Sequence, residues 1–158
     1  MAKRKKKKRL PTISRLKKRA DYLWSIMILM DGQERSPWEG GPNATCQVCL
    51  EREAYAAHHV FHKSMHGRVR YDRRNGLPIC KKCHFMERRD PAPVVFAAIR
   101  YHGCSVYSEF AMDVMATRNR GAYAWNREKI GLVIHALEEL ISAETVREVF
   151  GGAYPAPA

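Results

Sequence analysis

The chain has 158 residues, 46% of them hydrophobic, and a formal net charge of +12. This length suits one small domain with helical additions, and the charge indicates a polyanionic partner such as nucleic acid. The longest strongly apolar run, residues 23–30, is too short to span a bilayer and precedes no signal-peptide cleavage pattern. We therefore expect a cytoplasmic protein with reduced thiols and no membrane partner.

The first expected elements are a basic arm, a helix and a loop. Residues 3–9 are all Lys or Arg, so residues 1–11 are predicted to form a disordered arm that binds nucleic acid. A solvated tail or a localisation signal is the alternative. An amphipathic helix is expected over residues 12–31, with Leu16, Ala20, Leu23, Met27 and Met30 on its apolar stripe. Residues 32–45 contain several Gly and Pro residues and predict a loop.

Four cysteines form two Cys-x-x-Cys pairs, Cys46–Cys49 and Cys80–Cys83, separated by 30 residues. This spacing predicts a structural zinc site with four thiolate ligands. Two disulfides are the competing interpretation, but they require an oxidising compartment that nothing in the sequence indicates. The fifth cysteine, Cys104, is expected to be a buried free thiol.

If four cysteines fill the coordination shell of the zinc ion, then His58, His59 and His84 are not needed as ligands of that ion. Zinc brings the segment after Cys83 close to the segment after Cys49, so His84 is expected near the other two. Such a group could hold a second metal that binds a phosphodiester oxygen, beside a neutral imidazole that accepts a proton from water. The alternatives are surface histidines, or His84 in place of one cysteine at the zinc.

The order of these cysteines and histidines, with Asn75 between them, resembles the HNH, or ββα-metal, nucleases braced by two zinc knuckles. The resemblance implies an α+β fold whose ββα nuclease core spans residues 46–90. It implies that His59 is the general base, that His58 and His84 bind the catalytic ion, and that Asn75 braces the loop and orients the base. Hydrolysis in this family leaves 5′-phosphate and 3′-hydroxyl ends.

The resemblance does not identify which divalent metal is the catalytic ion. His58 stands where many members of the family have Asp. A neutral ligand at that position favours Mn²⁺, Ni²⁺ or Zn²⁺ over Mg²⁺. The expected cofactors are therefore a structural Zn²⁺ and one catalytic divalent metal.

Cations gather in the loop between two short strands expected over residues 53–60 and 76–79. They are Lys63, Arg68, Arg70, Arg73 and Arg74. Beside a phosphodiester site, such side chains are expected to contact backbone phosphates, and a plain solvated loop is the alternative. His62 and His66 share this loop as phosphate contacts or exposed side chains, with an extra metal ligand as the alternative.

The rest of the chain is expected to be helical. One helix should run from Lys81 to about Asp90, and residues 91–151 should form a C-terminal helical region before a tail at residues 152–158. Its helices are expected at residues 91–103, 105–118, 126–141 and 142–150.

A second, shorter resemblance concerns residues 16–21, Leu-Lys-Lys-Arg-Ala-Asp. They look like the basic segment that precedes the first knuckle in the lambdoid phage recombination nucleases NinG or Rap, which suggests branched recombination intermediates as substrates. We therefore expect a metal-dependent HNH endonuclease that acts on DNA ahead of RNA. The alternative is a non-catalytic zinc-knuckle module that binds RNA or DNA, such as a ribosome-associated protein.

Overall fold

The computed structural model describes residues 10–34, 44–117 and 123–141. The described elements are α1 (Ile13–Glu34), β1 (Ala56–His59), β2 (Gly76–Ile79), α2 (Lys81–Glu87), α3 (Ala92–His102), α4 (Cys104–Thr117) and α5 (Arg127–Leu140), with 3-10 turns at Gly67–Val69 and Arg73–Asn75. This mixture of helices and a small sheet confirms the predicted α+β class. The expected arm at residues 3–9, the last short helix and the tail lie outside the described residues.

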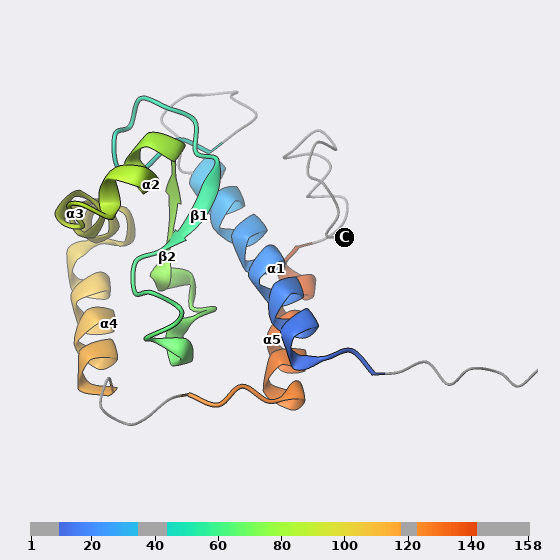
Figure 1. The fold of residues 1–158 in the computed structure, drawn as a ribbon. Helices are drawn as coiled ribbons and strands as arrows, with labels where there is room; N and C mark the ends of the chain where they lie inside the picture. The colour runs from blue at the N-terminus through green and yellow to red at the C-terminus, as the bar shows by residue number, and fades with distance from the viewer. Residues whose placement is uncertain (1–9, 35–43, 118–122, 142–158) are drawn as a thin grey trace, which may run out of the picture.

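The two strands form an antiparallel pair in which His58 lies opposite Leu77 and His59 lies opposite Gly76. The pair lies between α1 on one side and α3 on the other (Figure 1). Because both faces are covered, every residue of β2 is buried. The strand β2 has the bounds that the sequence predicts, whereas β1 is shorter, since Glu53 pairs instead with Thr45 in an isolated bridge.

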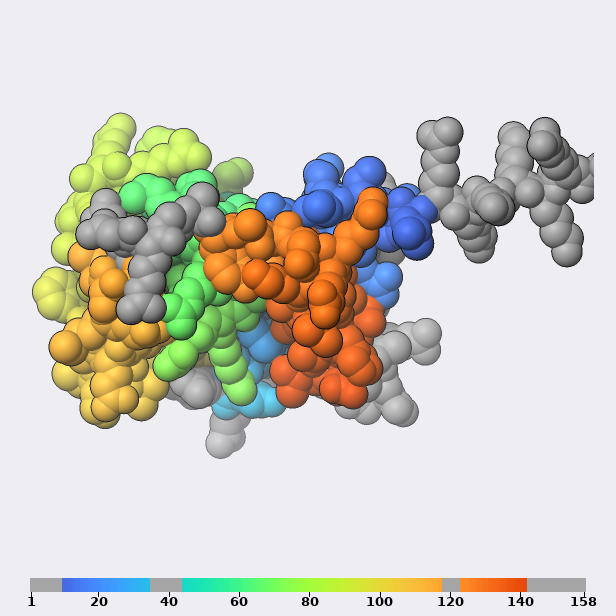
Figure 2. Space-filling model, turned by 90° about the horizontal axis from the view of Figure 1, so that it is seen from below, coloured from blue at the N-terminus to red at the C-terminus, as the bar shows by residue number. Residues whose placement is uncertain are grey.

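Helix α1 is more deeply buried than a one-sided amphipathic stripe predicts. Trp24, Ile26 and Ile28 lie off the predicted stripe, yet each is at most 2% exposed. The cause is that α1 packs against the sheet on one side and α5 on another (Figures 1 and 2). The helix also continues to Glu34, so Gly32, expected to begin a loop, is helical.

Helices α3 and α4 enclose a second group of buried side chains. Tyr107, Phe110 and Val114 of α4 pack against Ala98 of α3 and Val69 of the loop between the strands. In Figure 2 the green segment that contains this loop lies between α4 and α5. None of the helices within the described residues combines the length and the apolarity that a membrane span requires.

Gly32 allows α1 to lie directly against β2. A Cβ at this position would clash with the ring of Pro78 and lie 3.1 Å from the Cβ of Ala44. A proline ring cannot swing away as a flexible side chain can. We therefore expect Gly32→Ala to destabilise the protein by about 1–2 kcal/mol in urea unfolding, because overpacking exceeds the gain in helix propensity.

Gly131→Ala is the matched control, because Gly131 is also helical and its added Cβ meets nothing within 4 Å. Here only helix propensity changes, and we expect a stabilisation of about 1 kcal/mol. If both variants shift stability in the same direction, the close approach of α1 and β2 is not the constraint described.

Candidate metal and catalytic site

The sulfur atoms of Cys46, Cys49, Cys80 and Cys83 all lie within 4.8 Å of one another. The first pair lies in a turn closed by Leu50, whose N–H donates to the carbonyl of Cys46 at 2.9 Å. In the second pair, Cys80 is the N-cap of α2 and its sulfur accepts from the backbone N–H of Cys83. Four converging sulfurs are the donor set of a tetrahedral zinc site, so the cluster can hold a metal ion such as zinc.

The thiols of this cluster differ in acidity. Burial raises the pKa of Cys46 and of Cys83. Burial also opposes the thiolate of Cys49, but the backbone N–H groups of Glu51 and Arg52 and the neighbouring cysteines favour it, and its pKa falls to about 7. Because a metal requires thiolates, its uptake would release protons and would weaken as the pH falls.

Cys104 is free, as predicted, but exposed rather than buried. It is the first residue of α4, directly after Gly103, and packing in that first turn begins at Tyr107. The expectation of a buried thiol was wrong because cysteine composition does not reveal which side of a helix faces solvent.

A second group of ligand-type side chains lies between β1 and α2, and we call His58, His62, His84 and Glu87 the histidine cluster. The ring of His58 lies 5.1 Å from that of His84 and 6.3 Å from that of His62, centroid to centroid. Glu87 Oε1 lies 4.0 Å from Nε2 of His58 and 3.5 Å from Nε2 of His62. The structure thus brings His58 and His84 together, as expected, and adds a carboxylate.

Nε2 of His58 is buried and has no hydrogen-bond partner among the described residues. A buried polar nitrogen without a partner is costly, and a cation bound between the rings would satisfy it. Glu87 is 11% exposed in its side chain and supplies negative charge at the same place. Imidazole and carboxylate are donor types that borderline divalent ions accept. Within the described residues, however, only the four cysteines already bring their ligand atoms close enough together to form a metal-binding group.

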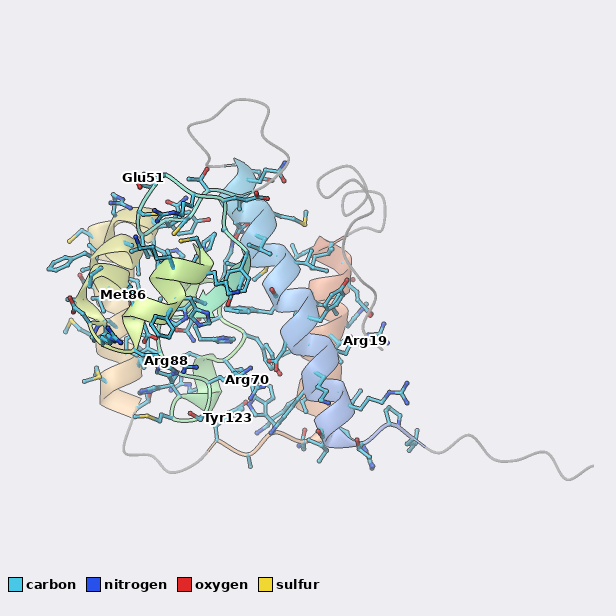
Figure 3. All side chains as sticks on the ribbon, turned by 45° about the horizontal axis from the view of Figure 1, so that its top comes forward. Arg19, Glu51, Arg70, Met86, Arg88 and Tyr123 are labelled. Carbon is cyan, nitrogen blue, oxygen red and sulfur yellow. The ribbon has the colours of Figure 1, made fainter. Side chains whose placement is uncertain are left out.

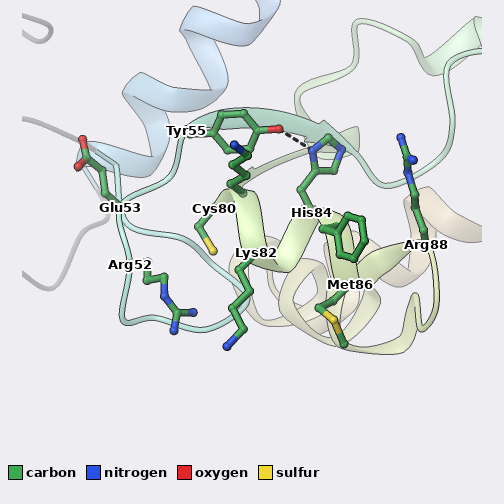
Figure 4. A pocket seen from close by; sticks show the side chains of 10 residues that line it. Arg52, Glu53, Tyr55, Cys80, Lys82, His84, Met86 and Arg88 are labelled. Carbon is green, nitrogen blue, oxygen red and sulfur yellow. Dashed lines mark hydrogen bonds between the residues drawn. The ribbon is translucent and has the colours of Figure 1, made fainter.

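Tyr55 orients His84 from outside the cluster. Its hydroxyl lies 2.9 Å from Nδ1 of His84 (Figure 4). In the tautomer where Nδ1–H donates to the phenol oxygen, Nε2 keeps the lone pair that a metal needs. Such an outer hydrogen bond fixes both the ring and the tautomer of a ligating histidine.

His59 was also expected near His84, but it lies on the opposite face of β1, because successive side chains of a strand alternate. Its ring stacks on Trp24 of α1, with centroids 3.9 Å apart. Nε2 of His59 lies 2.8 Å from the carbonyl oxygen of Arg70. A carbonyl only accepts, so Nε2 carries the hydrogen and Nδ1 is the nitrogen that can accept a proton.

Both adjacent histidines are neutral at neutral pH. Burial lowers the pKa of His58 to about 4 despite the opposing charge of Glu87. Burial also lowers the pKa of His59 to about 4 despite its hydrogen bond to the carbonyl of Arg70. Folded-state values below the ordinary 6.5 mean that stability is lost as the pH falls from about 6.5 to about 4. Neutral imidazoles are the forms that bind metals and accept protons.

Asn75 is fully buried and closes the loop between the strands. Its Oδ1 accepts from the N–H of Phe61 at 2.7 Å. Its Nδ2 donates to the carbonyls of Phe61 and Val69 at 3.0 and 3.1 Å. These bonds tie the start of the loop at Phe61 and its middle at Val69 to Asn75, which directly precedes β2.

Arg70, labelled in Figure 3, links the loop to α1. Its guanidinium donates two hydrogen bonds to the carboxylate of Asp21, at 2.8 and 2.6 Å, and its side chain is 15% exposed. Burial is the largest single effect and raises the pKa of Asp21, but the hydrogen bonds and charge of Arg70, together with the charge of Lys63, outweigh it and keep that pKa low. Lys63 lies 3.4 Å from the same carboxylate. The ion pair therefore positions the carbonyl that holds His59.

Two further arginines of the loop also have carboxylate partners. Arg73 pairs with Asp31 of α1, and Arg74 pairs with Asp72, its guanidinium lying 2.8 Å from the carboxylate. Arg68 is exposed and has no ion-pair partner within the described segments. Phosphate contacts by these cations remain a prediction, and the ion pairs show that three of the arginines also stabilise the loop.

Three side chains that surround the candidate site were not singled out in the sequence: Trp24, Tyr55 and Glu87. Only Glu87 carries a signal, since it follows His84 by three residues and therefore lies on the same face of α2. The other two lie on α1 and in the segment before β1, and their roles arise from packing. Asp21 belongs to the segment 16–21 noted in the sequence, but its ion pair with Arg70 was not expected.

Comparison of the chain with protein-family models, with curated proteins and with solved structures finds no match.

We expect the purified protein to contain about one equivalent of zinc per chain, held by the four clustered cysteines. Cys80→Ser should lose the metal and lower the melting temperature, because structural zinc contributes folding energy directly. Cys104→Ser is the control, since this exposed thiol lies outside the cluster. Wild-type melting and zinc content in Cys80→Ser would exclude the four-cysteine zinc site.

Proposed function

We propose that the protein is a metal-dependent endonuclease of the HNH type that hydrolyses phosphodiester bonds in DNA. The observation that carries this proposal is the buried Nε2 of His58, which faces the histidine cluster without a hydrogen-bond partner among the described residues. The order β1, β2, α2 around the cysteine cluster supports it. The net charge of +12 supports a polyanionic substrate.

In this proposal the catalytic ion is held by His58 and His84, with Glu87 as an added carboxylate. A divalent ion there supplies positive charge for the phosphate and the departing oxygen. Tyr55 keeps the ring of His84 in place through its hydrogen bond. Burial keeps His58 neutral, so its nitrogen is available at neutral pH.

His59 is the general base. Its Nδ1 takes a proton from the water that attacks phosphorus, while Nε2–H stays bonded to the carbonyl of Arg70. His58 and His59 face opposite sides of β1, and His59 is the last residue of that strand. A phosphate lying across the end of β1 would therefore contact both. Asn75 supports this geometry by closing the loop that carries the Arg70 carbonyl.

The resemblance of residues 16–21 to phage recombination nucleases extends the proposal to branched DNA. Asp21, the last residue of that segment, anchors Arg70 and hence the carbonyl bonded to His59. This contact gives one residue of the segment a physical role in positioning the base.

Cleavage of supercoiled plasmid tests the proposal, with Mg²⁺, Mn²⁺, Ni²⁺ or EDTA added. We expect metal-dependent nicking by the wild type and a loss of about 10²–10⁴-fold in His59→Ala, the usual effect of removing a general base. The fold and the DNA affinity of the variant should be retained, as measured by circular dichroism and by fluorescence anisotropy.

His135→Ala is the control, because this histidine is exposed on α5, with 72% of its side chain accessible. It should cleave like the wild type. Activity above ~1% in His59→Ala would remove His59 as the base. Tight DNA binding without cleavage under any metal would favour the non-catalytic zinc-knuckle module.

A further inference from the structure

A groove of about 940 Å³ lies along the outer side of α2, and His84 lines it together with Tyr55 (Figure 4). This volume falls within the usual ligand-site range of about 300–1,000 Å³. The groove therefore begins at a side chain of the histidine cluster and extends away from it. Any molecule bound in it would lie directly beside the candidate catalytic ion.

Large apolar side chains in this groove face solvent. Phe85 is 59% exposed, Tyr55 is 54% exposed and Met86 is 46% exposed. Aromatic rings that remain accessible in this way can stack on the flat face of a nucleic-acid base. Arg89 lies over the Phe85 ring at 5.6 Å, and a guanidinium plane is itself a stacking surface for bases.

The cations of the groove differ from those of the loop between the strands. Lys81, Lys82 and Arg88 line the groove, and none of them has an ion-pair partner among the residues that the structure describes. In contrast, Arg70 and Arg73 are held by carboxylates of α1. Three cations free of ion pairs within the described residues therefore line the groove beside His84.

We propose that this groove binds an unpaired DNA strand next to the bond that is cut, and this inference rests on the proposed nuclease function. Bases stack on Phe85 and Tyr55, and phosphates lie against Lys81, Lys82 and Arg88. The combination of exposed rings with unpaired cations is the arrangement that binds single strands. A duplex fits it poorly, because the faces of paired bases are already stacked within the helix.

Tyr55 connects the groove with the histidine cluster. The same side chain that offers its ring to the groove holds Nδ1 of His84 through its hydroxyl. A base stacked on Tyr55 is thus one side chain away from a candidate ligand of the catalytic ion. Recognition of the unpaired strand and placement of the scissile phosphate would then depend on neighbouring residues of one site.

Fluorescence anisotropy with a labelled single-stranded DNA and a duplex of the same length tests the groove, without added divalent metal so that no cleavage occurs. We expect Phe85→Ala to raise the Kd for the single strand by about 5- to 150-fold, the equivalent of one lost base stack. Its Kd for the duplex should stay unchanged. Phe85→Tyr, which keeps an aromatic ring, should retain the wild-type single-strand affinity.

Phe96→Ala is the matched control, because Phe96 is also an exposed phenylalanine, on α3 and outside the groove. It should change neither Kd. An unchanged single-strand Kd in Phe85→Ala would overturn the inference, as would equal weakening for the single strand and the duplex. Because this assay involves no cleavage, its outcome is independent of the plasmid assay that tests the nuclease function.

Discussion

The four clustered cysteines join the first Cys-x-x-Cys turn to the junction of β2 and α2. Cys80 separates the last residue of β2 from the first residue of α2, and its sulfur lies with those of the first knuckle. Whatever holds these sulfurs together therefore fixes α2 against the strands. That position determines how close His84 comes to His58, and so whether the two rings can share an ion.

Helix α1 supports the other face of the strands. Trp24 covers the ring of His59, and Asp21 holds Arg70, whose carbonyl fixes the tautomer of that ring. The same burial lowers the pKa of His59 and keeps it neutral at neutral pH. A helix that precedes the first Cys-x-x-Cys pair thus forms part of the environment of His59, and its close approach to β2 depends on Gly32.

The distribution of charge adds information that the net charge does not contain. A value of +12 predicts a polyanionic partner but does not show which surface binds it. Three of the four arginines of the loop between the strands, Arg70, Arg73 and Arg74, are paired with carboxylates of the protein. In contrast, Lys81, Lys82 and Arg88 of the α2 groove are not paired within the described residues. The proposed contact surface for DNA therefore follows α2, beside His84.

The sequence by itself determined the features that depend on local geometry. These include the bounds of β2, the start of α5 after Asn126, and the clustering of the cysteines from their Cys-x-x-Cys spacing. Caps, turns and short spacings act within a few residues, so they can be read from the chain. Only the tertiary structure decided the ion pair of Arg70 with Asp21, 49 residues away, and the hydrogen bond between Tyr55 and His84. Such contacts depend on how distant elements pack, and no local periodicity encodes that.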